Sequence, residues 1–305
     1  MTLLYRPPPS EQVYESYLPG RYAGFRVERY FAERFPYLSE TQWRDLLLQD
    51  RVTVNGRPAR PGLVLHLHDR IVTRMGVRQE PAADCTLRLL YEDRHLRVFN
   101  KGAPLPVHPC GRYHRNSLTE LLRRAYPEEV PRPVQRLDAL TTGLQVFART
   151  RRAARDLMFA FQENRVVKDY LALVRGVPRE RVFVVDRPIG KIAGSARGTG
   201  PRAQNPKPAR TAVYWLAHRE GVSLLRVRPL TGRTNQIRVH LAACGLPLVQ
   251  DPVYGDDAEG GRPCGLHAFR LTLVCLGRSL RLTAPPPALF DTFREWYENP
   301  RLPQP

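Results

Sequence analysis

The fold assignment depends above all on residues 135–148, which read QRLDALTTGLQVFA. In this stretch Asp138 lies between Arg136 and a Thr-Thr-Gly turn, and Gln145 to Ala148 are typical of a buried strand. A carboxylate on a loop that leads into a buried strand is held rigidly, as a nucleophile or a base must be. Taken alone, an aspartate in such a loop is more often a cap or a turn residue, so this stretch does not by itself name a reaction.

Two further strings follow later in the chain. Residues 168–176, KDYLALVRG, alternate like a strand and carry Tyr170 near their start. Residues 230–241, LTGRTNQIRVHL, combine a bend at Gly232 with Arg233 and Arg238, whose guanidinium groups can pair with carboxylate or phosphate. Each residue also has a plainer interpretation, since Tyr170 fits a core position and either arginine fits a surface or loop-ordering position.

The pattern around these strings predicts an α+β domain with a large mixed, mostly antiparallel sheet and several helices. Helices are expected at residues 116–126 and 152–164, the first with Ser117 and Glu120 at capping-box spacing. The expected strands are residues 89–93, 96–101, 145–148, 170–174, 212–216, 222–227 and 271–275.

The N-terminal part of the chain predicts a separate small α+β unit. Apolar residues recur at helical spacing from Val27 to Phe35, and Pro36 ends that helix. Ser39 is an expected N-cap for a second helix, with Gln42 as its capping-box partner. Short strands at residues 52–54 and 69–72 flank an Asn-Gly turn at residues 55–56.

With 305 residues, the chain is long enough for two domains at roughly 100–200 residues each. We expect a loosely structured arm at residues 1–23, the small unit at 24–75, a linker at 76–86 and a catalytic domain at 87–300.

The charge indicates a polyanionic partner. Lys and Arg number 48 against 29 Asp and Glu, a net charge of +19, and such an excess attracts nucleic acid and releases its counterions. A GC-rich genome would explain arginine in place of lysine, but not the surplus of positive charge. Residues 194–208 form a basic Gly/Pro loop that is either mobile near RNA or a solvated hairpin tip.

Other classes of protein are disfavoured by the composition. No apolar run reaches the roughly 18 residues of a membrane span, and the N-terminus lacks a signal-peptide core, so a cytoplasmic protein is expected. The five cysteines show no CxxC spacing, which speaks against a disulfide framework and a zinc site. His66 and His68 could face one way and bind a metal, but such a pair is more often a surface feature.

Together and in this order, the three strings resemble the RluA-type family of RNA pseudouridine synthases. That family carries HRLDxxTSGL, KxYxAxVxG and TGRxHQIRxH motifs, followed by GDxxYG, which DPVYG at residues 251–255 resembles. The resemblance spans about residues 87–290, and residues 25–33, 49–56 and 69–71 are similar to an S4 RNA-binding module, which often precedes this domain. Further matches are Tyr91-Glu92-Asp93, Asn100-Lys101, residues 105–109, Leu266-His267-Ala268 and Ala284-Pro285-Pro286.

The resemblance implies a reaction that detaches uracil from ribose C1′, turns it and rejoins it through C5. It implies that Asp138 is the essential carboxylate, that Arg238 pairs with it, and that Tyr170 lies against the uracil and relays the C5 proton. Arg136 would fill the gap left by the flipped base, and Arg233 would contact phosphate or order its loop. Whether Asp138 attacks uracil C6, attacks C1′ or abstracts a ribose proton is left open.

An isomerisation of this kind needs no cofactor and no metal, and we expect none. The expected partner is structured RNA, with Arg44 and Arg51 of the S4-like module as candidates for phosphate contacts. Ribosomal RNA is favoured as the target, although residues 107–113, VHPCGRY, are similar to a family branch that includes transfer RNA modifiers. A monomer would suffice for the reaction.

The sequence departs from the family pattern at several positions, which bear on target choice and loop shape. The departures are Gly102 for Pro, Gln135 for His, Ala139 for a frequent Arg, Thr142 for Ser, Asn235 for His and Gln250 for Gly. Two rival functions stay open: a non-catalytic RNA-binding relative, and a hydrolase that uses two carboxylates at a glycosidic bond, for which Asp251 is the candidate second acid.

Overall fold

The computed structural model describes residues 4–194, 196–255 and 262–298. It contains two compact units, one formed by Pro7–Glu80 and the other by Met1–Arg6 with Pro81–Pro305. Residues 1–3 of the predicted arm, Ser195 of the basic loop, and residues 256–261 and 299–300 of the predicted catalytic domain lie outside the described residues.

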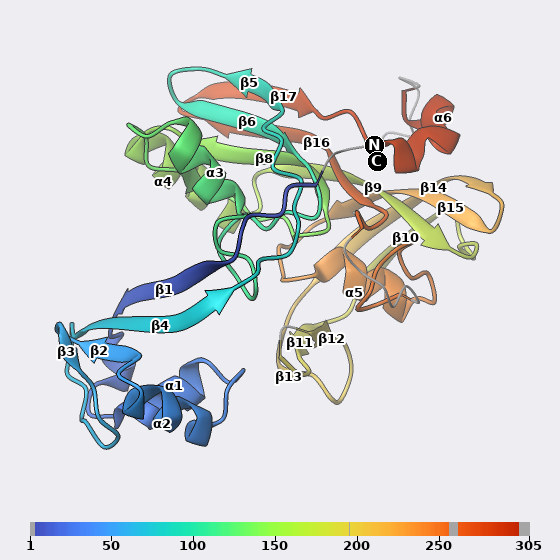
Figure 1. The fold of residues 1–305 in the computed structure, drawn as a ribbon. Helices are drawn as coiled ribbons and strands as arrows, with labels where there is room; N and C mark the ends of the chain where they lie inside the picture. Colours follow the sequence, from blue (N-terminus) through green and yellow to red (C-terminus); the bar gives the residue numbers. More distant parts are fainter. Residues whose placement is uncertain (1–3, 195, 256–261, 299–305) are drawn as a thin grey trace. The chain divides into compact units, whose positions relative to one another are not determined.

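The unit Pro7–Glu80 is a four-stranded antiparallel sheet with two helices (Figure 1). Its strands lie in the order β1-β4-β2-β3, and Trp43 of α2 stacks on Phe31 of α1 in its core, with ring centroids 4.4 Å apart. Its elements are β1 (Ser10–Tyr17), η1 (Gly20–Tyr22), α1 (Val27–Arg34), α2 (Glu40–Leu48), β2 (Val52–Val54), β3 (Arg57–Pro58) and β4 (Arg70–Arg78).

Three local predictions for this unit are confirmed. The first helix ends just before Pro36, and the second begins after the N-cap Ser39. The capping box is complete, because Ser39 Oγ accepts from the backbone N of Gln42 at 3.2 Å and Gln42 Oε1 accepts from the backbone N of Ser39 at 2.9 Å. The turn at Asn55 and Gly56 has φ angles of 51° and 80°, as a hairpin turn of this type requires.

The expectation of a loosely structured arm is wrong for Ser10–Tyr17, which form β1. This strand pairs antiparallel with β4, and β4 continues to Arg78, into the start of the predicted linker. Two ion pairs join the strands: Glu15 with Arg70 at 2.7 Å and Glu11 with Arg74 at 3.4 Å. The strand is held by a partner about 60 residues away in sequence, and its mostly polar side chains give no apolar alternation to reveal it.

The larger unit is built on a ten-stranded sheet, and the predicted α+β class with a mostly antiparallel sheet is confirmed. Its main path runs β10-β14-β15-β9-β16-β8-β6-β5, with β17 beside β16 and β7 beside β8, and the β16–β8 pairing is parallel. The strands are β5 (Leu89–Glu92), β6 (Leu96–Lys101), β7 (Arg132–Pro133), β8 (Thr142–Ala148), β9 (Val167–Arg175), β10 (Val182–Asp186), β14 (Arg210–Arg219), β15 (Val222–Pro229), β16 (Leu266–Cys275) and β17 (Arg278–Thr283).

Helices cover both faces of this sheet. Side chains of α3 and α4 pack against β6, β8 and β16, those of α5 against β14 and β15, and those of η2 and α6 against the opposite face of β9 and β15. No helix in the described part of the chain is long and apolar enough to span a membrane. The helices are α3 (Leu118–Ala125), α4 (Arg151–Gln162), α5 (Gln236–Ala243), η2 (Ala288–Phe293) and α6 (Arg294–Glu298).

One local prediction for this unit is wrong. Ser117 lies at the N-cap of α3, but its hydroxyl donates to the carbonyl of His114 at 3.2 Å, and Glu120 pairs with Arg123, so no capping box forms. The basic loop at residues 194–208 contributes β12 (Arg197–Gly198) and β13 (Gln204–Lys207), which pair with β11 (Ile189–Lys191) in a separate small sheet.

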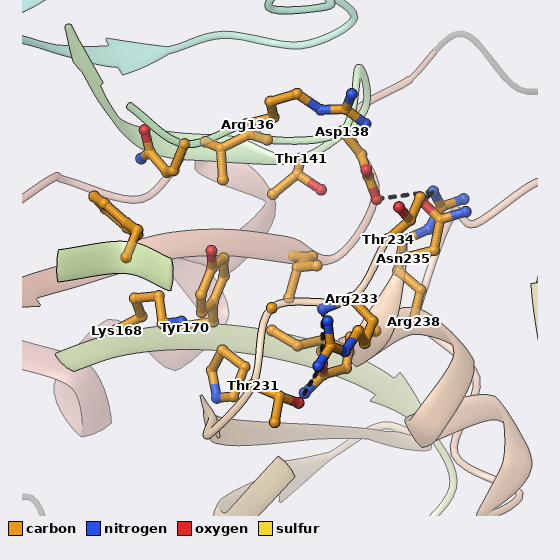
Figure 2. Close-up of a pocket in the computed structure, with 18 of the residues that line it drawn as sticks. Arg136, Asp138, Thr141, Lys168, Tyr170, Thr231, Arg233, Thr234, Asn235 and Arg238 are labelled. Atoms are coloured by element: carbon orange, nitrogen blue, oxygen red, sulfur yellow. Dashed lines mark hydrogen bonds and ion pairs between the residues drawn. The ribbon is translucent and has the colours of Figure 1, made fainter. Parts of the chain in front are cut away.

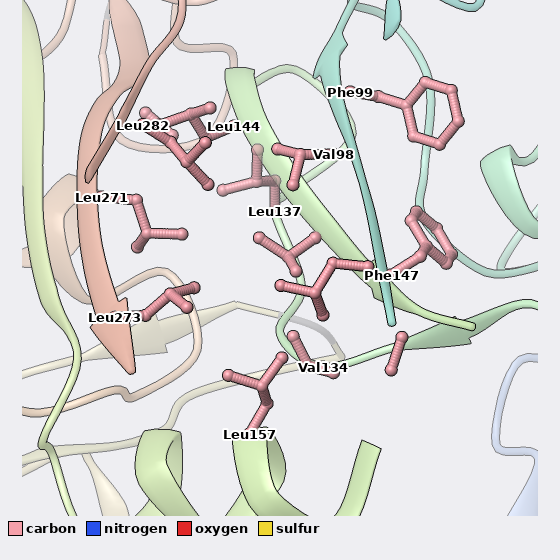
Figure 3. Close-up of a cluster of buried hydrophobic side chains, with 14 of the residues drawn as sticks. Val98, Phe99, Val134, Leu137, Leu144, Phe147, Leu157, Leu271, Leu273 and Leu282 are labelled. Atoms are coloured by element: carbon pink, nitrogen blue, oxygen red, sulfur yellow. The ribbon is translucent and has the colours of Figure 1, made fainter. Parts of the chain in front are cut away.

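The main apolar core lies between α4 and the strands β6, β8, β16 and β17 (Figure 3). Leu157 of α4 points into the cluster near Val134 and Leu273 of β16, and all three side chains are buried. Burial of apolar surface of this kind is the dominant favourable contribution to folding. The core therefore fixes the sheet whose strand ends carry the three strings described above.

The parallel contact between β8 and β16 requires glycine at position 143. Gly143 pairs with Ala268 and has a φ angle of 107°, a conformation that side-chain-bearing residues rarely adopt. A Cβ atom at this position would lie 2.3 Å from the carbonyl oxygen of Ala268. The two backbones approach this closely only because no side chain separates them.

We predict that Gly143→Ala lowers the free energy of unfolding by about 2–5 kcal/mol, because overpacking adds to left-handed strain. Urea unfolding followed by fluorescence would measure this change. Gly221→Ala is the matched control: Gly221 has a φ angle of 74° and a Cβ atom there would meet nothing within 4 Å, so it should lose only about 1–2 kcal/mol. Equal losses in the two variants would show that the contact with Ala268 is not close.

Candidate active site

A pocket of about 450 Å³ opens in the larger unit at the ends of the central strands (Figure 2). Its wall comes from the loop before β8, from the start of β9, from the loop after β15 and from the first turn of α5. Its volume falls within the roughly 300–1,000 Å³ of small-molecule sites. The three sequence strings singled out above thus meet around one cavity.

Asp138 and Arg238 form an ion pair at one end of this pocket. Arg238 Nη1 lies 3.1 Å from Asp138 Oδ2, and the two side chains come from positions 100 residues apart (Figure 2). The side chain of Asp138 is 30% exposed and that of Arg238 only 8%. The carboxylate is therefore accessible from the pocket while its cationic partner is largely shielded from water.

Arg238 is held in place by a second carboxylate behind it. Its Nε and Nη2 atoms donate to the two oxygens of Asp251, each at 2.8 Å, and Asp251 is fully buried. Asp251 Oδ1 also accepts from the backbone N–H groups of Val253 and Tyr254 at 3.0 and 3.1 Å. Because both of these bonds go to the same carboxylate, the guanidinium has a single orientation, and one N–H remains directed at Asp138.

The charges of this cluster stabilise one another. Burial acts to raise the pKa of Asp251, but the hydrogen bonds and charge of Arg238, together with the two backbone N–H groups, outweigh it and lower that pKa below its usual value. Burial in turn acts to lower the pKa of Arg238, and its bonds to Asp251 and the charge of Asp138 raise it instead. Both groups are therefore ionised at neutral pH.

Lys101, the last residue of β6, ties together the loops below Asp138. Its buried ammonium group donates to the carbonyls of Gly102, Leu105 and Ala139 at 2.8, 2.7 and 3.3 Å. Burial lowers the pKa of Lys101 to about 7, although the charge of Asp138 opposes this shift. In the sequence, Lys101 is only one letter of a matching motif, and nothing in its spacing predicts this role.

Two glutamine side chains fix the loop that carries Asp138. Gln145 is fully buried; its Nε2 donates to the backbone carbonyl and to Oε1 of Gln135, each at 2.8 Å, and its Oε1 accepts from the backbone N of Leu137 at 3.3 Å. Gln135 Nε2 donates to the carbonyl of Leu144 at 3.0 Å. The amide at position 135 thus anchors the loop in the place where the family motif has a histidine.

Tyr170 lines the pocket on the side opposite Arg238, and Lys168 lies two residues before it on the same face of β9 (Figure 2). Burial raises the pKa of Tyr170, and the negative charge of Asp138 raises it further. Burial lowers the pKa of Lys168. The phenol is therefore neutral at neutral pH and can lie against an uncharged ring.

The predicted RNA-contacting arginines are placed differently from one another. Arg136 and Arg233 are exposed and line the pocket. The Nε of Arg233 donates to the carbonyl of Pro208 at 3.0 Å, which orders its loop. Arg44 is exposed on α2 and Arg51 is half-buried before β2; both belong to the unit Pro7–Glu80, and neither lines this pocket.

In the described part of the chain, no group of three or more His, Cys, Asp or Glu side chains is arranged to bind a metal ion. Asp138 is the one acidic side chain among the described residues that line the pocket. The pocket can therefore offer one carboxylate, one neutral phenol and several cations to a ligand.

The matching family model and the similar proteins described below are all named pseudouridine or pseudouridylate synthases. A family model described as RNA pseudouridylate synthase matches residues 95–243. A Nitrosomonas europaea protein named ribosomal large subunit pseudouridine synthase D is 38% identical over 283 residues, which cover 87% of this chain and 81% of that protein. A human protein named pseudouridylate synthase RPUSD2 is 29% identical over 255 residues, 81% of this chain but 45% of its own length, so the chain spans about half of that relative.

One solved structure shares the fold over most of the larger unit. The human RNA pseudouridylate synthase domain containing 1 superposes with a TM-score of 0.61 at 30% sequence identity, covering 71% of this chain and 90% of that one.

We predict that Asp251→Asn destabilises the protein by about 3–5 kcal/mol at pH 7, because it leaves Arg238 buried without its main partner. Since the pKa of Asp251 is lowered from its usual 3.8, its contribution is complete above that pH and is lost as the pH falls further. In urea unfolding, the difference in stability between the two proteins should therefore be smaller at pH 3 than at pH 7.

The matched control is Asp186→Asn, which removes an exposed aspartate paired with Arg210 at 3.1 Å. An exposed pair contributes about 0–1 kcal/mol, so this variant should be nearly as stable as the wild type. A loss at Asp251 no larger than at Asp186 would contradict the structural role assigned to the buried pair.

Proposed function

Because the chain belongs to the RNA pseudouridylate synthase family, as its motifs predict, we propose that it is an isomerase that converts specific uridines of structured RNA into pseudouridine. The observation that carries this proposal is the position of Asp138, a pocket-lining carboxylate paired with Arg238 and facing the neutral phenol of Tyr170. This is the set of groups that an attack on a flipped nucleotide requires.

Asp138 acts in its ionised form, since a protonated acid is neither a nucleophile nor a base. The ion pair with Arg238 fixes the direction of the carboxylate. Three steps are compatible with the geometry: attack on uracil C6, attack on ribose C1′, and abstraction of a ribose proton. In each case the glycosidic bond to N1 breaks, a bond from C1′ to C5 forms, the C5 proton leaves to solvent and N1 takes up a proton, with no change in oxidation state.

Tyr170 stacks on the uracil and helps the C5 proton to leave. Its raised pKa keeps the phenol protonated, so the ring adds no charge to the face of the base. A neutral phenol can take up a proton at its oxygen only as it passes its own proton on, and it therefore acts as a relay rather than as the final acceptor.

The target base has to leave its helix to reach the pocket, at an unstacking cost of a few kcal/mol. Arg136 is exposed at the rim beside Asp138, and its planar guanidinium suits the vacancy that the base leaves. Arg233 and Lys168 add positive charge around the same opening, which favours the phosphates on either side of the flipped nucleotide.

The unit Pro7–Glu80 serves as an S4-like module that binds structured RNA. Its two helices and hairpin occupy the positions that this resemblance expects, and Arg44 and Arg51 are its candidate phosphate contacts. Arg44 and Arg51 would then add affinity that is independent of the chemistry in the pocket.

Ribosomal RNA is the favoured substrate and transfer RNA the alternative. The Nitrosomonas relative is named as an enzyme of the large ribosomal subunit, and it is similar to this chain over most of both lengths. We propose that a monomer is the working unit and that it acts in the cytoplasm.

The hydrolase alternative is less well supported because Asp251 cannot serve as its second acid. Asp251 is fully buried and both of its oxygens are bonded to Arg238. A non-catalytic RNA-binding relative would share the charge and the fold, so only an activity measurement separates it from the enzyme.

We predict that Asp138→Asn abolishes pseudouridine formation, with a loss of more than about 1,000-fold, while RNA binding persists, because the amide keeps the shape but cannot act as nucleophile or base. The assay is tritium release from RNA that contains uridine labelled at C5, with ribosomal and transfer RNA as separate substrates. Pseudouridine mapping in cells with and without the gene would identify the position.

Asp186→Asn, an exposed aspartate outside the pocket, should retain full activity as the control. Undiminished turnover in Asp138→Asn would refute the assignment. A wild type that binds RNA without releasing tritium would favour the non-catalytic alternative, and release of free uracil would favour the hydrolase.

We predict that Tyr170→Phe reduces turnover by about 100-fold or more while RNA affinity changes little, because the ring still stacks but the proton relay is lost. Single-turnover kinetics and a filter-binding titration on the same RNA would separate the two quantities. Equal losses in rate and affinity would count against the relay.

A further inference from the structure

Asn235 is the N-cap residue of α5, yet its side chain does not cap the helix. Asparagine is among the best N-cap residues because its side-chain oxygen accepts from a backbone N–H in the first turn. Here the backbone of Asn235 is left-handed, with a φ angle of 56°, and no side-chain cap bond forms. The side chain is directed instead toward Asp138 and Arg238 (Figure 2).

The amide of Asn235 bonds to the carboxylate of Asp138. An ionised carboxylate only accepts hydrogen bonds, so the amide nitrogen must face it. In that orientation the nitrogen donates to Asp138 Oδ1 at 3.2 Å and to Oδ2 at 3.0 Å, and the amide oxygen accepts from the hydroxyl of Tyr254 at 2.9 Å. Asn235 thus supplies donors on the Asp138 carboxylate beside the N–H of Arg238.

Tyr254 keeps this amide from turning over. Its hydroxyl accepts from the backbone N–H of Arg197 at 2.9 Å, which leaves its own proton for the oxygen of Asn235. The centre of the Tyr254 ring lies 5.0 Å from the guanidinium carbon of Arg238. The backbone N–H of Tyr254 donates a hydrogen bond to Asp251. Every bond around the hydroxyl has one consistent direction, so the amide presents its nitrogen to Asp138.

We propose that Asn235 is a positioning residue for the proposed pseudouridylation, which holds the carboxylate of Asp138 in its working orientation, and that Tyr254 fixes the orientation of the Asn235 amide. The proposal rests on the proposed function. The family motif has histidine at this position, and the amide differs from it in one physical respect, because it does not titrate near neutral pH. The donors on Asp138 are therefore independent of pH across the working range.

Other charged or titratable groups face Asp138 from each neighbouring element, and all remain in the variants proposed here. Arg238 lies on α5 and Lys101 at the end of β6. Tyr170 lies on β9 and Cys264 shortly before β16. A change in pH dependence that follows a substitution at position 235 can therefore be assigned to that position.

The decisive variant is Asn235→Asp, which keeps the shape of the side chain but places a second carboxylate against Asp138. The acidic limb of the single-turnover rate should move to higher pH by about one unit or more, because like charges in contact disfavour ionisation. RNA affinity should stay within about twofold, since the contact is not made to RNA. Asn235→Ala should slow the reaction by about 10- to 100-fold, the range expected for one hydrogen bond to a charged group, and Tyr254→Phe should slow it less.

Asn164→Ala is the matched control. Asn164 also has a left-handed backbone, with a φ angle of 55°, but it is exposed and does not line the pocket. Its replacement should leave the rate and its pH dependence unchanged. The comparison therefore distinguishes the loss of the hydrogen bond to Asp138 from the effect of placing alanine in a left-handed backbone conformation. Rates in Asn235→Ala equal to those in Asn164→Ala would overturn the proposal.

Failure of this proposal is distinguishable from failure of the proposed function. If the wild type is active and Asn235→Asp keeps the wild-type pH profile, the positioning role is wrong and the function stands. If the wild type has no activity on any RNA, the function is wrong. The contact is then tested without activity, by following the ¹³C signal of the Asp138 carboxyl carbon: its titration midpoint should move upward in Asn235→Asp, and an unchanged midpoint would overturn the contact.

Discussion

The guanidinium of Arg238, held between two carboxylates, is the interaction on which the site depends. Asp251 takes two of its N–H groups at 2.8 Å and balances its charge inside the protein, whereas Asp138 receives one at 3.1 Å. If the guanidinium made both of these hydrogen bonds to Asp138 instead, both oxygens of that carboxylate would be occupied and its reactivity would be lower. Because Asp251 accepts the two paired hydrogen bonds, Asp138 receives only one. Arg238 therefore orients the Asp138 carboxylate, whose negative charge still faces the pocket.

The sheet brings these groups together through one short parallel contact. Ala268 of β16 pairs with Gly143 of β8 on one side and with Tyr170 of β9 on the other. The loop that ends in β8 carries Asp138, so this row of three residues sets the separation between the carboxylate and the phenol. The absence of a side chain at Gly143 permits the backbones to meet, and the fixed spacing that follows is what an attack on a bound base requires.

The sequence predicts those parts of the molecule that depend on interactions between neighbouring residues or on the three sequence motifs. The capping box at Ser39, the Asn-Gly turn and the antiparallel character of the large sheet follow from neighbouring residues. Strand β1 escapes prediction because it is held by a partner far along the chain, and the predicted capping box at Ser117 is wrong because a nearer carbonyl takes its hydroxyl. The burial of Asp251 and the three carbonyls around Lys101 depend on tertiary packing, which spacing in the sequence does not report.

The departures from the family pattern are compensated by their own neighbours. Gly102 stands where proline is usual, and a Cβ there would lie 1.9 Å from a carboxylate oxygen of Asp84, so the missing side chain makes room for that residue. Gln250 has a φ angle of 57° where the family has glycine, which costs about 1–2 kcal/mol of backbone strain in front of the buried Asp251. The bonds that Asp251 receives from Arg238 and two backbone N–H groups offset this strain. These local compensations leave the donors on Asp138 in place, and Asn235, which stands where the family has histidine, itself supplies one of them.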